Sequence, residues 1–174
     1  MSAVNAFRRI QIKKQAFDRA RQIKTTTNFF QKTRRSYLSS VVRGELTDAR
    51  KVEVALIKRL EEREGMKLND VLKSTLTHYL RKGIPLSNCL LILELKSKLL
   101  SGDKHLDVSP RYRKKEVLDI ELELTQVIFE SLRLARRNAE KEGLTEYANN
   151  LSIEISAKAR LLTQYKKVFN QLVE

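Results

Sequence analysis

The chain has 174 residues, of which 41% are hydrophobic, and its formal net charge at pH 7 is +14. This length and hydrophobic share are typical of one folded domain, and they exclude an intrinsically disordered chain. No run of about 18 apolar residues occurs, which excludes a transmembrane helix, and the single cysteine, Cys89, fits a cytoplasmic protein without disulfides.

Five glycines, each after a segment of helical spacing, divide the chain. Glycine ends helices readily because it adopts a left-handed backbone. The clearest start signal is Ser109, an N-cap that precedes Pro110 at the first helical position. No segment alternates with the period of a strand, so we predict an all-α, compact multi-helix bundle that forms a single domain. The expected helices cover about residues 3–23, 27–42, 47–64, 70–82, 87–101, 110–142 and 145–173.

The first two expected helices lie in a strongly basic region, residues 1–44. This region carries eleven Lys and Arg against one acid, a net charge of +10, whereas residues 45–109 and 110–174 carry +2 each. Arginine outnumbers lysine here by seven to four, and its guanidinium forms bidentate bonds with phosphate. Tyr37, close to Arg34 and Arg35, is the candidate for stacking on a base, whereas the phenylalanines are expected in the core. The candidate nucleic-acid-binding residues are Arg8, Arg9, Lys13, Lys14, Arg21, Lys32, Arg34, Arg35, Tyr37 and Arg43.

The expected helix at residues 87–101 is apolar on nearly all sides. Such a helix belongs inside a bundle or against a partner. Cys89 is therefore expected to be a small buried hydrophobic residue. The apolar residues that surround the helix axis are Cys89, Leu90, Leu91, Ile92, Leu93, Leu95, Leu99 and Leu100.

The last two expected helices are long, have wide apolar faces and are joined at Gly143. We expect them to form an antiparallel hairpin whose apolar faces are ordinary core, or, in part, an exposed strip for self-association or docking. A secondary basic patch ends the first of the two helices. It either complements the helix dipole or adds to a nucleic-acid surface. The patch consists of Arg133, Arg136, Arg137 and Lys141.

The sequence offers no pattern for catalysis, metal binding or a cofactor. His78, His105 and Cys89 do not have the spacing of a zinc site, and no phosphate-binding or nucleophile motif occurs. Asp119 and Glu123 share a helix face, but basic neighbours favour a solvated, charge-paired face over a metal site. We therefore expect a non-enzymatic protein with no metal and no cofactor.

Sequence-independent binding to the phosphate backbone is the function that these patterns favour. A segregated positive charge concentrates polyanions, and arginine suits phosphate contact. The helices at 70–82 and 87–101 do not read a duplex as a helix-turn-helix, because the second is apolar. DNA and RNA, single strand and duplex, all fit the pattern, with a single strand or a guide RNA favoured as partner and no membrane expected.

A small, basic, all-helical chain of this kind resembles the small subunits of CRISPR surveillance complexes, which act in antiviral defence. The resemblance implies a non-enzymatic subunit that stabilises the guide, target or displaced strand. It also implies that apolar helix ends pack against other copies or other subunits. The residues it implies for phosphate contact are Arg8, Arg9, Lys13, Arg34 and Arg35.

Two alternatives remain from other classes of protein. One is an accessory DNA-binding protein of plasmid, phage or transposon machinery, which would prefer a duplex. The other is a structural adaptor whose basic segment docks an acidic protein, and which would show no salt-sensitive binding to nucleic acid.

Overall fold

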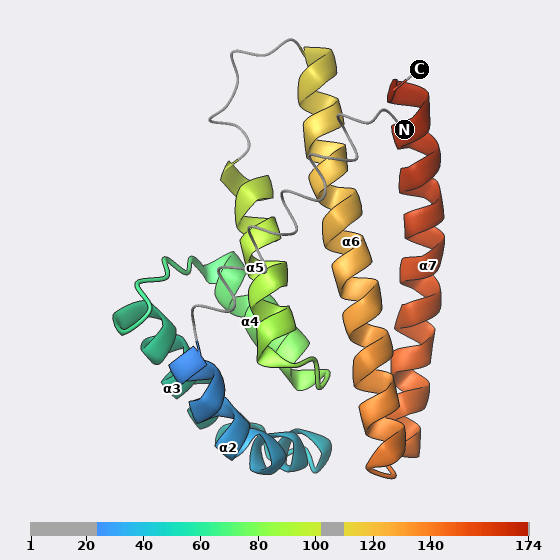
Figure 1. Cartoon of the computed structure of the whole chain (residues 1–174). Coiled ribbons are helices and arrows are strands. Elements are labelled where there is room, and N and C mark those ends of the chain that lie inside the picture. Colours follow the sequence, from blue (N-terminus) through green and yellow to red (C-terminus); the bar gives the residue numbers. More distant parts are fainter. Residues whose placement is uncertain (1–23, 102–109, 174) are drawn as a thin grey trace.

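The computed structural model describes residues 24–101 and 110–173 and shows an all-helical protein, so the predicted fold class is confirmed. These residues form six helices and no strand (Figure 1). The expected helix at 3–23 lies outside the described residues. The helices are α2 (Lys24–Val42), α3 (Leu46–Glu62), α4 (Asp70–Arg81), α5 (Leu86–Ser101), α6 (Pro110–Lys141) and α7 (Thr145–Val173).

The helix boundaries follow the glycine and capping signals closely. Gly83, which follows α4, has a φ of 82°, and its N–H donates to the carbonyl of Leu80 at 3.0 Å. Asn69 caps the start of α4 by accepting a hydrogen bond from the backbone N–H of Leu72 at 2.9 Å. Each of these contacts satisfies a backbone group that the helix end leaves without an intrahelical partner.

The start expected at residue 27 is wrong, because α2 begins at Lys24 and includes the three threonines. Thr26 is buried, and its hydroxyl donates to the Glu64 carboxylate at 2.7 Å. This contact joins the beginning of α2 to the segment after α3. Tertiary contacts of this kind override the modest helix preference of a β-branched residue.

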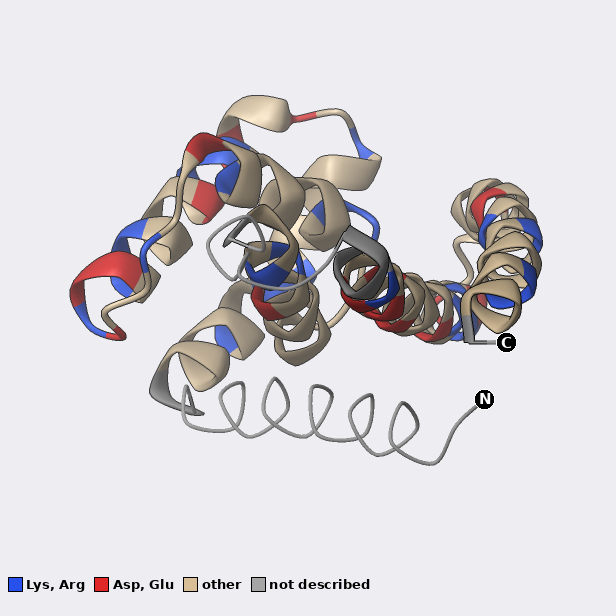
Figure 2. Cartoon of the chain, turned by 90° about the horizontal axis from the view of Figure 1, so that it is seen from above, with Lys and Arg blue, Asp and Glu red and all other residues tan. Residues whose placement is uncertain are grey.

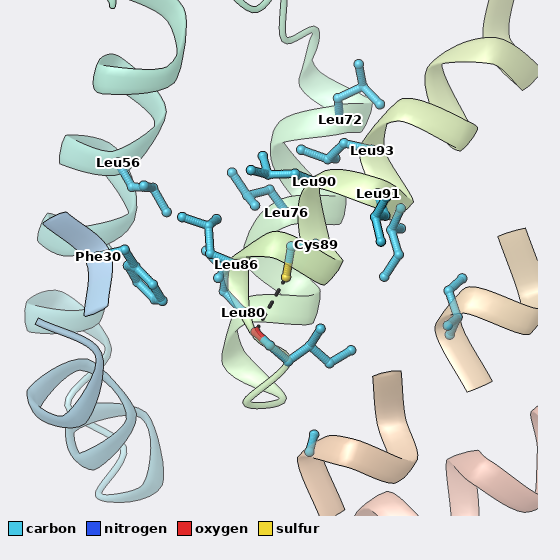
Figure 3. Packing of buried hydrophobic residues seen from close by; sticks show 14 of the residues in the cluster. Phe30, Leu56, Leu72, Leu76, Leu80, Leu86, Cys89, Leu90, Leu91 and Leu93 are labelled. Atoms are coloured by element: carbon cyan, nitrogen blue, oxygen red, sulfur yellow. Dashed lines mark hydrogen bonds between the residues drawn. The ribbon is translucent and has the colours of Figure 1, made fainter. Parts of the chain in front are cut away.

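Helix α5 lies at the centre of the main core, as its apolar sequence predicts. It packs against α4 and α6 and also contacts α2. Figure 3 shows Leu86, Leu90 and Leu93 of α5 beside the leucines of α4, with Phe30 and Leu56 on the side of α2 and α3. The expectation fails only at the end of α5, where Leu99 is half-buried and Leu100 is 47% exposed.

Helices α6 and α7 lie side by side along their length and run in opposite directions (Figure 1). Their apolar faces meet, and one part of this contact is a second small core of Leu122, Leu162 and Phe169. Near the start of α7, the Tyr147 hydroxyl donates to the backbone carbonyl of Arg81 in α4. The first turns of α7 therefore contact α4 as well as α6.

Candidate nucleic-acid interface

Helix α2 provides the first part of a basic surface. The helix contains four Lys and Arg and no acidic residue. Lys32 and Arg35 are exposed, while Arg34 is half-buried at the edge of the packed face. No acid on the same helix neutralises these cations; Arg34 lies 3.9 Å from Glu142, whereas Lys32 and Arg35 are exposed to an anionic partner.

The end of α6 provides the second part. Arg133, Arg137 and Lys141 are all exposed, and their spacing of four residues places them along one side of the helix. Arg136 points elsewhere, because it is half-buried and lies 3.9 Å from Glu140. Three of the four residues in the predicted secondary patch therefore form one exposed row.

These two basic parts, about a hundred residues apart in the sequence, lie near each other in the fold. Arg34 Nη1 of α2 lies 3.9 Å from Glu142 Oε1, just after the end of α6. A hollow of about 330 Å³ lies between the helices and is lined by Arg34 and Arg35 of α2, by Asn138 of α6 and by the start of α5. Lys141 lies three residues after Asn138, so the two side chains are neighbours on the surface of α6. We define Arg34, Arg35, Arg137 and Lys141 as the α2–α6 basic surface.

The assignment of Tyr37 to base stacking is wrong. Its side chain is only 1% exposed, its ring packs edge-to-face on Phe30, and its hydroxyl donates to Glu53 Oε2 at 2.7 Å. Burial, together with the Glu53 carboxylate, raises the pKa of this hydroxyl. Tyr37 therefore belongs to the core, and a base cannot reach its ring in this conformation.

The other predicted residues are not among the four that define the α2–α6 basic surface or lie outside the described residues. Arg43 is exposed after the end of α2, where it lies 3.4 Å from the Glu45 carboxylate. Lys32 is exposed on α2. The candidates outside the described residues are Arg8, Arg9, Lys13, Lys14 and Arg21.

A buried ionic network, which the sequence did not reveal, holds α2, α3 and α4 together. Glu53 of α3 is 1% exposed and accepts hydrogen bonds from Tyr37 of α2 and from Arg81 of α4. Arg81 Nε and Nη2 bind the two carboxylate oxygens at 2.7 and 2.8 Å, a bidentate geometry. These hydrogen bonds raise the pKa of the Arg81 guanidinium, so the guanidinium stays charged.

Helix α7 contains a second basic stretch that the sequence analysis missed. Residues 155–173 include Lys158, Arg160, Lys166 and Lys167 and no acid. Figure 2, in which Lys and Arg are blue, shows several blue segments along this helix. Three of the four side chains are exposed, and the absence of acids over nineteen residues was the signal available in the sequence.

A polar cleft of about 690 Å³ lies between α4 and α7, with Arg50 of α3 at its side. Its charged residues are four cations, Arg50, Lys73, Arg81 and Lys82, and two carboxylates, Asp70 and Glu154. Hydroxyl, amide and imidazole groups complete the lining, and we call this space the α4–α7 cleft. Its other lining residues are Ser74, Thr77, His78, Tyr147, Asn150 and Leu151.

The expectation of a solvated face at Asp119 and Glu123 is wrong, since these residues are only 3% and 4% exposed. No group of three or more His, Cys, Asp and Glu that could hold a metal ion occurs in the part of the chain that the structure describes. Cys89 is buried in the core, and burial raises the pKa of its thiol.

Comparison of the chain with protein families, curated proteins and solved structures gives no match. Within residues 24–101 and 110–173, every helix is too short or too polar to cross a membrane. The functional interpretation therefore rests on the chain's own residues.

Proposed function

We propose that this protein binds nucleic acid without sequence preference, through the phosphate backbone, and that it is not an enzyme. The observation that carries the proposal is that Arg34 and Arg35 line one hollow together with Asn138 of α6, which is next in the chain to Arg137 and three residues before Lys141. The basic residues of the N-terminal segment belong to the same proposed interface. Together they provide a field that attracts polyanions and guanidinium groups that bind phosphate.

Phosphate contact is favoured over base contact by the side chains that are exposed. The large hydrophobic residues that are most exposed in the described part of the chain are aliphatic, and Tyr37 is buried. Stacking on single-stranded bases requires accessible aromatic rings, whereas phosphates require only cations. On α6, the step of four residues from Arg137 to Lys141 corresponds to about 6 Å along the helix axis. Such a row can follow a backbone and carries no sequence information.

The proposal extends to a role as a subunit of a nucleoprotein complex, as the resemblance to CRISPR small subunits implies. In that role, sequence would be recognised by base pairing within the complex, and this chain would hold the guide, target or displaced strand. An accessory DNA-binding protein of plasmid, phage or transposon machinery would use the same surface on a duplex.

The test is fluorescence-anisotropy titration with scrambled single-stranded and duplex oligonucleotides. The variant with Arg34, Arg35, Arg137 and Lys141 all changed to Ala is expected to bind about tenfold more weakly or worse. The matched control removes the same charge elsewhere, at four exposed cations of α3 and the following loop. The control residues, all changed to Ala, are Lys51, Lys58, Arg63 and Lys67.

The type of oligonucleotide that binds more tightly distinguishes the strand-holding subunit from the accessory DNA-binding protein. Tighter binding to the single strand supports the strand-holding subunit, and tighter binding to the duplex supports the accessory DNA-binding protein. Equal losses in the two variants would overturn the assignment of the α2–α6 basic surface. No binding by the unaltered chain at low salt would overturn the proposed function.

A second candidate function, an adaptor for an acidic protein, is favoured by one feature of α3. A hollow of about 690 Å³ there combines exposed Leu46 and Val54 with the cations Arg50 and Lys51. Such a surface suits an amphipathic helix with acidic edges. This function predicts that Val54→Asp abolishes capture of the acidic partner, while nucleic acid does not bind at any salt concentration.

A further inference from the structure

The α4–α7 cleft has the size and the lining of a site for a small anionic ligand. Its volume of about 690 Å³ lies within the usual range for ligand pockets, about 300–1,000 Å³. Cations reach it from two helices, Arg50 from α3 and Lys73 from α4, and α7 forms the opposite wall. Convergence of charged groups from separate elements distinguishes this cleft from a row of surface lysines on one helix.

The lining of the cleft contains more cations than carboxylates, and each of these cations lies within 4 Å of a carboxylate. Glu154 forms an ion pair with Lys82, so these two charges offset each other. Asp70 lies at the start of α4, where the helix dipole favours a negative charge. The lining itself has four cations against two carboxylates, but Glu53 lies against both Arg81 and Arg50, and Lys73 lies 3.6 Å from Glu61. An anion in the cleft would therefore share these cations with carboxylates that lie behind them.

Neutral donors add to these charges. The hydroxyls of Ser74 and Thr77 and the amide of Asn150 line the same space. Arg81 binds Glu53 through Nε and Nη2, so Nη1 is the terminal nitrogen left for a further partner. Its side chain is 32% exposed and is held in place by the buried carboxylate. A guanidinium that is fixed in this way loses little entropy when it binds an anion.

His78 lines the same cleft and can serve as a probe of charge there. Burial lowers the pKa of His78, and the ammonium groups of Lys82, Lys158 and Lys96 lower it further. The Glu154 carboxylate acts in the opposite direction. The imidazole stacks edge-to-face on Tyr79, at 4.9 Å between ring centroids. An anion in the cleft would offset the lysine charges and raise the pKa of His78 toward its ordinary value.

We propose that the α4–α7 cleft binds a phosphomonoester group, carried by a free mononucleotide or by the 5′ end of a nucleic-acid strand. A phosphomonoester has a charge of about −1.5 to −2 and three acceptor oxygens, which match the cations and hydroxyls of the cleft. A phosphodiester inside a strand carries a single charge. The strand-end form of this inference rests on the proposed function, whereas the mononucleotide form does not.

The experiment compares three probes on the full chain. They are a 5′-phosphorylated single strand, a 5′-hydroxyl strand one nucleotide longer with nearly the same charge, and adenosine 5′-monophosphate. The phosphorylated strand is expected to bind about tenfold tighter than the hydroxyl strand. The double variant Arg50→Ala with Lys73→Ala is expected to lose this preference. The control, Lys51→Ala with Lys58→Ala, removes two exposed charges of α3 that do not line the cleft and is expected to keep this preference.

Proton NMR of the two histidines provides a second measurement on the folded chain. The NMR signal of His78 is identified as the one that disappears in His78→Gln. Adenosine 5′-monophosphate is expected to raise the pKa of His78 in the unaltered chain but not in the double variant Arg50→Ala with Lys73→Ala. A response to the mononucleotide assigns the site to free nucleotides as well as to strand ends. A response to the phosphorylated strand alone assigns it to strand ends.

The outcomes separate this inference from the proposed function. Equal affinity for the two strands, with no response of His78 to the mononucleotide, would overturn the cleft site and leave nucleic-acid binding intact. A preference that survives in the double variant would also overturn it. Binding of the mononucleotide without binding of either strand would support the cleft and refute the proposed function.

Discussion

Replacing Glu53 by Gln removes the charge at the centre of the network that joins α2, α3 and α4. Gln keeps the volume of the side chain but replaces one acceptor oxygen by an NH₂ donor. That donor would face either Tyr37 or Arg81, both of which donate hydrogen bonds to Glu53. The Arg81 guanidinium would then lose its countercharge in a site where the carboxylate is 1% exposed.

The expected loss of stability follows from this geometry. Removing one partner of a buried ion pair costs about 3–5 kcal/mol. Because Arg81 is 32% exposed, water can solvate part of its charge, so we expect the lower end, about 3 kcal/mol. In a chain of this length, such a loss lowers the Tm by about 6–12 °C.

Urea denaturation followed by far-UV circular dichroism measures this change. The matched control is Glu62→Gln, an exposed carboxylate on the same helix, which we expect to change the free energy of unfolding by less than about 0.5 kcal/mol. A loss below about 1 kcal/mol in Glu53→Gln would refute the conclusion that the ionic network holds the three helices together.

Three further predictions concern buried groups and one turn. Burial raises the pKa of Tyr79 to about 12 and also raises that of Tyr147, so the folded state favours the protonated phenols. The stabilisation that these protonated phenols provide is complete below about pH 10 and is lost as the pH rises toward 12. Tyrosinate absorbance should therefore increase together with the loss of helicity. Complete ionisation near pH 10 with intact helices would contradict this prediction. Cys89 is buried with a raised thiol pKa, so a thiol reagent should label it only in denaturant, and rapid labelling of the native chain would show that this part of the core opens. Gly83→Ala places a side chain at a φ of 82°, which should lower the free energy of unfolding in urea by about 1–2 kcal/mol, and an unchanged midpoint would contradict the left-handed turn.

The helices could be predicted because their signals are local. Glycines with positive φ follow four of the described helices, and Asn69 and Pro110 stand at the starts of α4 and α6. The central position of α5 followed from apolar residues on all its sides. Leu100 was misplaced because a periodic pattern does not reveal where neighbouring helices end.

Burial of polar side chains could not be predicted in the same way. Tyr37 is close in sequence to Arg34 and Arg35, but it lies seven residues, two helical turns, after Phe30 and shares its buried face. Asp119 and Glu123 were expected to be solvated because basic residues precede them, yet both are buried in α6. In each case residues that help to bury the polar side chain belong to other helices, which a local sequence pattern does not reveal.

The candidate site was predicted in part. Exposed cations on α2 and α6 were expected, but the proximity of the two helices at one hollow depends on the path of the chain. One signal was present and overlooked: Glu53 lies four residues from Ala49 and from Ile57, on the apolar face of α3. A buried acid at such a position needs a partner that compensates its charge, and this partner is Arg81.

The most direct test of the proposed function is the dependence of affinity on salt, measured with the full chain and a scrambled single-stranded oligonucleotide. The logarithm of the association constant should fall linearly with the logarithm of salt concentration. Each phosphate contact on a single strand contributes about 0.7 to the slope, so the variant of the α2–α6 basic surface, which lacks four cations, should have a slope shallower by about 3. An affinity that does not change with salt, or equal slopes for the variant and the unaltered chain, would contradict phosphate binding by this surface.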